Sequence, residues 1–127
     1  MTKGPRNIHL TDIMRYRFPI VALASILHRI SGLIIFLLIP FVLWLLRASL
    51  ASPQEFLLVQ DFMGSMWVSL LIWLVASATF YHLLAGIKHL IMDMGHLEEK
   101  NTGRIASIVV LLLGISGAIL MGVWVLC

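Results

Sequence analysis

Residues 105–125 read IASIVVLLLGISGAILMGVWV and contain no ionisable side chain. A run of this kind can supply the roughly 20 apolar residues that a helix needs to cross the hydrocarbon core of a bilayer. A helix also satisfies its own backbone hydrogen bonds, which lipid cannot do. The sequence therefore predicts a transmembrane helix over residues 105–126.

Two earlier segments have the same character. The first span is predicted over residues 20–46 and the second over residues 66–89. Short connections, residues 48–61 and 93–104, leave no room for another domain. We therefore predict a single membrane domain over residues 1–127, all-α, with three transmembrane helices.

The composition agrees with a membrane protein and excludes several other classes. Of the 127 residues, 61% are apolar and only 12% are charged, against about a quarter charged in soluble domains. The basic residues lie between apolar blocks rather than on one polar face, so no nucleic-acid partner is expected. A single cysteine, Cys127, excludes an internal disulfide and an iron–sulfur cluster held by this chain alone. No glycine-rich dinucleotide fingerprint occurs, and we expect no catalytic residue of a flavin enzyme.

The basic residues predict the orientation of the chain. Eight of the nine flank the start of the first span or the second connection, and Arg47 alone lies on the other side. Those eight are Lys3, Arg6, Arg15, Arg17, Arg29, Lys88, Lys100 and Arg104. The positive-inside rule then places the N-terminus in the cytoplasm and the C-terminus outside. No signal or transit peptide is recognisable, so we expect a multi-pass protein of a bacterial inner membrane.

His82 is the most informative polar residue, because ionisable groups at membrane depth are costly and usually functional. It shares one helix face with Ala85, Gly86 and His89, where the small residues leave a groove for a flat macrocycle. A neutral imidazole is a common haem ligand. The residues alone leave an alternative open: His82 bonds a carbonyl or hydroxyl of a neighbouring helix, and the small residues are ordinary packing.

A second polar group lies at the start of the first span, in SILHRISG, residues 25–32. Ser25 and Arg29 are i, i+4 neighbours, and a hydroxyl and a guanidinium can both donate to a quinone carbonyl. Arg29 can equally pair with a haem propionate. The alternative is that His28 and Arg29 only extend toward the lipid headgroups.

Three stretches together resemble the cytochrome b membrane-anchor subunits of succinate dehydrogenase (succinate:quinone oxidoreductase, respiratory complex II). They are RFPI at 17–20, SILHRISG at 25–32 and YHLLAGIKHLIMD at 81–93. The resemblance implies that His82 is the axial ligand of haem b iron, and that Ser25 and Arg29 form part of a ubiquinone site. It also implies that His28 and Arg29 lie near the haem propionates, with His89 as a further haem candidate. Lys88 departs from the family, where arginine is common.

The resemblance also implies a function and a set of partners. The chain would pack with a second small anchor subunit into a helix bundle, share haem b with it, and hold an iron–sulfur subunit and a flavoprotein on the membrane. The second axial ligand is expected from that partner. Electrons from succinate would pass to quinone in the tricarboxylic acid cycle and respiratory chain, and the chain would not oxidise succinate by itself. The alternatives are an anchor of a fumarate reductase and a haem-free membrane anchor.

The orientation can be tested with terminal tags. A tag before Met1 should be protected from an externally added protease in intact cells, whereas a tag after Cys127 should be cleaved, because the basic residues are biased eight to one. Permeabilised cells, in which both tags should be cleaved, provide the control. Protection of the C-terminal tag together with cleavage of the N-terminal one would contradict the predicted orientation.

Overall fold

The computed structural model describes residues 19–97 and 99–126. Within them, helices α2 (Ile20–Ser49), α4 (Met66–Asp93) and α5 (Lys100–Leu126) are each long and apolar enough to span a membrane. The described residues form no strand, so the prediction of an all-α protein with three transmembrane helices is confirmed. The basic residues up to Arg17 and the cysteine Cys127 lie outside the described part, and the orientation across the membrane stays a prediction.

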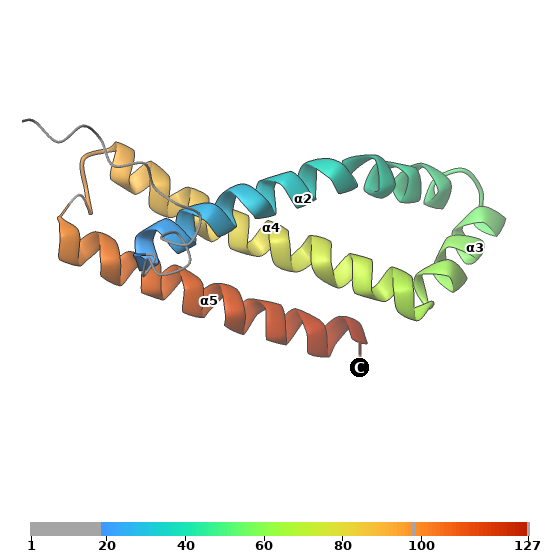
Figure 1. The fold of residues 1–127 in the computed structure, drawn as a ribbon. Helices are drawn as coiled ribbons and strands as arrows, with labels where there is room; N and C mark the ends of the chain where they lie inside the picture. Colours follow the sequence, from blue (N-terminus) through green and yellow to red (C-terminus); the bar gives the residue numbers. More distant parts are fainter. Residues whose placement is uncertain (1–18, 98, 127) are drawn as a thin grey trace, which may run out of the picture.

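Helix α4 is the centre of the arrangement. It packs against α5 along most of its length and against α2 around their crossing, whereas α2 and α5 contact each other less. Figure 1 shows the three long helices lying side by side, with α3 and the end of α5 at one end of the bundle. The start of α2 and the α4–α5 connection lie at the other end. The polar residues singled out in the sequence belong to α2 and α4, at this second end.

The connection between the first two spans contains a helix that the sequence analysis treated only as a link. This helix, α3, covers Pro53–Met63. The Ser52 hydroxyl accepts a hydrogen bond from the Glu55 backbone N–H at 3.1 Å, and Pro53 occupies the first turn. Serine followed three residues later by glutamate is the signature of a helix start, so the signal was present in the sequence.

A left-handed glycine ends α4. Gly95 has a φ of 80°, a conformation that costs glycine little. Its N–H bonds the Met92 carbonyl at 2.9 Å, and the His96 N–H bonds the Ile91 carbonyl at 3.2 Å. These two bonds satisfy carbonyls at the end of the helix and turn the chain toward α5.

Most large apolar side chains face outward. Among the described residues, Trp124 is 84% exposed and Phe36 is 69% exposed, whereas the buried apolar residues are only alanines and valines. An apolar surface of this extent is far larger than soluble monomers show. The outward-facing side chains are therefore suited to lipid or to neighbouring membrane helices.

Glycines of α5 receive aromatic rings of α4. A Cβ built on Gly114 would lie 2.5 Å from the Tyr81 ring, and one built on Gly117 would overlap the Phe80 ring. Near the other end of the pair, the Trp73 indole N–H donates to the Ala118 carbonyl at 2.8 Å and lies beside Gly122. Small residues allow this close approach, which is the usual basis of helix association in lipid.

We expect Gly117→Ala to destabilise the bundle by about 1–3 kcal/mol, the usual cost of an extra methyl group in a packed site. Thermal unfolding of the purified protein in detergent, followed by helical circular dichroism, would measure the loss. Ser116→Ala, at an exposed neighbouring position, is the matched control and should change little. Adding Phe80→Leu should recover part of the loss, and equal stability of both alanine variants would show that the ring does not depend on Gly117.

Candidate functional site

The α2–α4 crossing brings three histidines together. His28 comes from α2, and His82 and His89 come from α4, two helical turns apart on one face. The His28 and His82 rings stack with their centroids 4.2 Å apart, and those of His28 and His89 are 5.1 Å apart. All three are partly buried. The structure therefore assembles His28, His82 and His89, which the sequence had placed on two separate helices, into one cluster.

Two glycines lie at this crossing, one on each helix, and Gly32 leaves no room for a side chain. A Cβ on Gly32 of α2 would lie 2.9 Å from Cε1 of His82, and a Cβ on Gly86 of α4 would lie 3.6 Å from Nε2 of His28. On each helix, the glycine thus lies against the histidine of the other helix. The sequence suggested that the small residues beside His82 leave a groove for a macrocycle. In the structure, the His28 side chain lies against this groove at Gly86, at ordinary contact distance.

The hydrogen bonds of His82 determine which of its nitrogens is free. Nδ1 lies 3.1 Å from the His28 carbonyl oxygen and 3.1 Å from the Ser31 hydroxyl oxygen. A carbonyl oxygen can only accept, so Nδ1–H is the donor in that bond. In the neutral ring, Nε2 then keeps its lone pair. Among the described residues, no hydrogen bond engages this nitrogen, which leaves it available to a metal ion.

This arrangement unites the two interpretations that the sequence left open. His82 does bond a carbonyl and a hydroxyl of a neighbouring helix, as the packing interpretation supposed. Ligating histidines commonly donate their other ring N–H to a carbonyl, which fixes their tautomer and orientation. The bonds at Nδ1 are therefore compatible with a ligand role for Nε2.

The described residues contain no group of three side chains able to hold a bare metal ion. Haem iron is different, because the porphyrin supplies most of its ligands and the protein supplies only axial ones. One free imidazole nitrogen therefore fits haem rather than a bare ion. The 4.2 Å stack of His28 on His82 leaves no space for a macrocycle between these two rings.

Ser25 and Arg29 occupy the same side of α2 as Gly32. Ser25 is half-buried and lies about two helical turns before Gly32, and Arg29 is exposed and lies about one turn before it. Within the described part of the chain, neither side chain forms a hydrogen bond to another protein group. The Arg29 charge is close enough to act on His89. Both side chains are thus positioned beside the histidine cluster with hydrogen-bonding capacity to spare.

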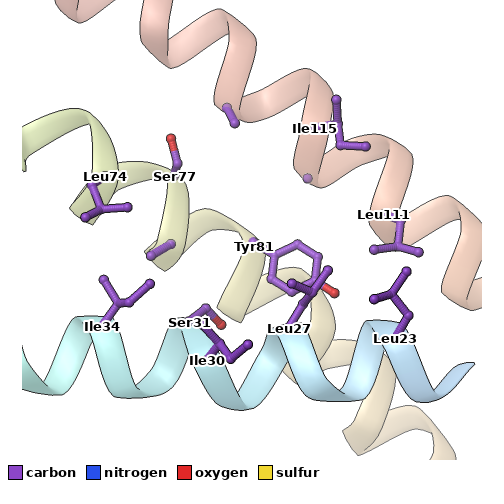
Figure 2. A pocket seen from close by; sticks show the side chains of 13 residues that line it. Leu23, Leu27, Ile30, Ser31, Ile34, Leu74, Ser77, Tyr81, Leu111 and Ile115 are labelled. Carbon is purple, nitrogen blue, oxygen red and sulfur yellow. The ribbon is translucent and has the colours of Figure 1, made fainter. Parts of the chain in front are cut away.

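An apolar chamber, not anticipated from the sequence, lies on another face of α2. It has a volume of about 440 Å³, is lined by α2, α4 and α5, and is open on one side. Figure 2 shows Tyr81 of α4 projecting into it, with Ser31 and Leu27 on α2 and Leu111 on α5. The Tyr81 hydroxyl donates to the Ala24 carbonyl at 2.9 Å. Ser25 and Arg29 do not line this chamber, whereas Ser31 lines it and also contacts His82.

The environment of Lys88 differs from the one expected from the sequence. It was counted among the basic residues near the second connection, but the side chain is only 4% exposed. Its ammonium group has no hydrogen-bond partner among the described residues. The Lys88 charge acts on both His28 and His89. Two basic residues, Arg29 and Lys88, and one acidic residue, Asp93, therefore lie near the cluster.

Comparison with known proteins identifies the family of this chain. Residues 4–126 match the family model described as "Succinate dehydrogenase/Fumarate reductase transmembrane subunit". The succinate dehydrogenase cytochrome b556 subunit of Coxiella burnetii is 40% identical over 124 residues, which cover 97% of each chain. The corresponding subunit of Rickettsia felis is 32% identical over 74% of this chain and 70% of its own length.

A third relative, from Paracoccus denitrificans, has the same name and is 39% identical over 64% of this chain and 62% of its own. The region matched by the family model contains the α2–α4 crossing and all three spans. The chain therefore belongs to the family of succinate dehydrogenase and fumarate reductase transmembrane subunits.

Proposed function

We propose that this protein is the haem b-binding membrane anchor of a bacterial succinate dehydrogenase and that it helps to form the quinone-reduction site. Family membership supports an anchor of complex II, and the relatives named cytochrome b556 imply haem b. The single observation that carries the haem assignment is His82, whose Nδ1 is engaged by α2 while its Nε2 has no protein partner among the described residues.

His82 is the proposed axial ligand of the haem iron. Haem b, when bound, supplies one-electron redox chemistry. His28 and Arg29 can hold propionate groups. Nε2 of His28 is buried and has no hydrogen-bond partner in the described part of the chain, and the Arg29 guanidinium is exposed beside the cluster. His89 stays a further candidate because its ring lies 5.1 Å from that of His28. The second axial ligand is assigned to the second anchor subunit, since His28 stacks on His82.

The quinone site is proposed at Ser25 and Arg29. A hydroxyl and a guanidinium, one helical turn apart on α2, can both donate to a carbonyl oxygen as negative charge develops on it during reduction. Electrons reach this point from the iron–sulfur subunit, which receives them from the flavoprotein. This chain holds the quinone and stabilises its reduced oxygen, and succinate oxidation belongs to the flavoprotein.

The exposed apolar faces of α2, α4 and α5 support a place within a larger helix bundle. We assign part of this surface to the second anchor subunit and the rest to lipid. A fumarate reductase anchor is the alternative, because the matching family model covers both enzymes. The curated relatives described above are all named for succinate dehydrogenase, which favours that direction of the reaction.

His82→Leu tests the haem assignment. In the purified membrane complex, we expect this substitution to remove or greatly disturb the reduced b-type absorption bands, because leucine has no lone pair for iron. His96→Leu is the matched control, since His96 is exposed outside the helices, and its spectrum should be that of the wild type. Wild-type bands in the His82→Leu complex would remove His82 from the ligand role.

Ser25→Ala and Arg29→Leu test the quinone site. Each should slow succinate-driven quinone reduction, by roughly 5- to 150-fold for a lost hydrogen bond of about 1–3 kcal/mol. Electron transfer from succinate to a dye that accepts electrons at the soluble subunits should be preserved. Ser49→Ala and Arg47→Leu, at the opposite end of α2, are the controls. Normal quinone kinetics in assembled Ser25 and Arg29 variants would show that the site uses other residues.

A further inference from the structure

The protein groups around Nδ1 of His82 all come from one turn of α2. Ser31 is only 5% exposed, and its hydroxyl oxygen lies 3.1 Å from Nδ1. The His28 carbonyl oxygen is at the same distance from Nδ1. Gly32 lies against the carbon between the two ring nitrogens. We call these three groups, the Ser31 hydroxyl, the His28 carbonyl and the Gly32 backbone, the His82 cradle.

The proton of Ser31 decides how the cradle acts. The Ser31 O–H donates to the His28 carbonyl at 2.8 Å. A hydroxyl has a single proton, so its oxygen presents only lone pairs to His82. The His28 carbonyl is likewise an acceptor. With the proton placed there, both groups facing Nδ1 accept. For a ring protonated at Nε2, the Ser31 hydroxyl would have to turn away from the His28 carbonyl to donate, and that carbonyl would then face a bare nitrogen.

We propose that Ser31 and Gly32 are positioning residues for His82, holding the ring in the Nδ1–H form with its plane fixed so that Nε2 is presented to the haem iron. This inference rests on the proposed haem-binding function. The His28 carbonyl favours the Nδ1–H tautomer because it can only accept. Ser31 adds a second acceptor that holds the ring plane, and Gly32 sets the ring position through close contact. Neither residue touches the iron, and each acts through His82.

The backbone of Gly32 lies so close to the His82 ring that no side chain fits between them. A Cβ at this position would lie 2.9 Å from Cε1 and 3.4 Å from Nδ1 of His82. The His82 ring is held by two hydrogen bonds. An added Cβ at Gly32 would therefore require either a shift of this ring or a separation of α2 from α4. Either change moves Nε2 away from its present position.

Ser77 provides a matched comparison for Ser31. Both serines line the apolar chamber, Ser31 on α2 and Ser77 on α4, and Figure 2 shows the Ser77 hydroxyl directed away from α2. The Ser77 hydroxyl is buried and has no hydrogen-bond partner within residues 19–97 and 99–126. Ser77→Ala therefore removes the same atom from the same chamber without touching the cradle.

The experiment uses the intact, purified complex carrying Ser31→Ala, Ser31→Thr, Gly32→Ala or Ser77→Ala. Haem affinity is measured by transfer to an excess of apomyoglobin, and ligation by the low-spin optical and electron paramagnetic resonance signals. Ser31→Ala should weaken haem affinity roughly 10- to 100-fold, the usual effect of removing a hydrogen-bond partner of a ligating histidine. Ser31→Thr keeps the hydroxyl and has chamber space for its methyl group, so it should restore the affinity.

Gly32→Ala should alter the low-spin signals, because the ring is displaced, and Ser77→Ala should match the wild type in both measurements. If Ser31→Ala does not assemble, Ser31→Cys fills the same space with a weaker hydrogen-bonding group and should show the same loss. Wild-type affinity in the assembled Ser31 variant, or wild-type signals in Gly32→Ala, would overturn the inference. If His82→Leu also kept the haem, the proposed function itself would fail, which separates the two results.

Discussion

The hydrogen bond from His82 Nδ1–H to the backbone carbonyl of His28 is the contact on which the site depends. It joins a side chain of α4 to the main chain of α2 at 3.1 Å, and in lipid such a bond has no water to compete with it. It requires the absence of a side chain at Gly32, where a Cβ would lie 2.9 Å from Cε1 of His82. The same contact that brings the helices together also sets the tautomer of the proposed iron ligand, so packing and chemistry cannot be separated here.

The contacts between α4 and α5 also stabilise the α2–α4 crossing. Phe80 and Tyr81 immediately precede His82, and their rings fill the spaces above Gly117 and Gly114. Tyr81 additionally bonds the Ala24 carbonyl of α2, so a single residue connects all three helices beside the histidine. The rotation of α4 about its axis is thereby determined by aromatic residues on one face, and the direction of His82 on the adjacent face follows from it.

Charge and apolar surface define what the site accepts from outside. Arg29 is exposed and Lys88 is buried, and their charges act on the histidine cluster. Buried positive charge is costly unless an anion accompanies it, and haem propionates are anions of suitable chemistry. The surrounding surface is apolar, with side chains such as Phe36 and Trp124 facing outward. The proposed haem, a flat apolar cofactor with two carboxylates, matches both the positive charge and the apolar surface.

The sequence by itself determined the three spans, because helix formation in lipid requires only a sufficient apolar run such as residues 105–125. It also pointed to His82, Ser25 and Arg29 as candidate site residues, because polar groups at membrane depth are conspicuous and the motifs around them resemble a family. It did not determine that His28 would stack on His82, that Ser31 would bond it, or that Lys88 would be buried. These facts depend on how α2 and α4 are rotated against each other. That rotation is decided by close contacts between residues about fifty positions apart, which no local pattern of spacing encodes.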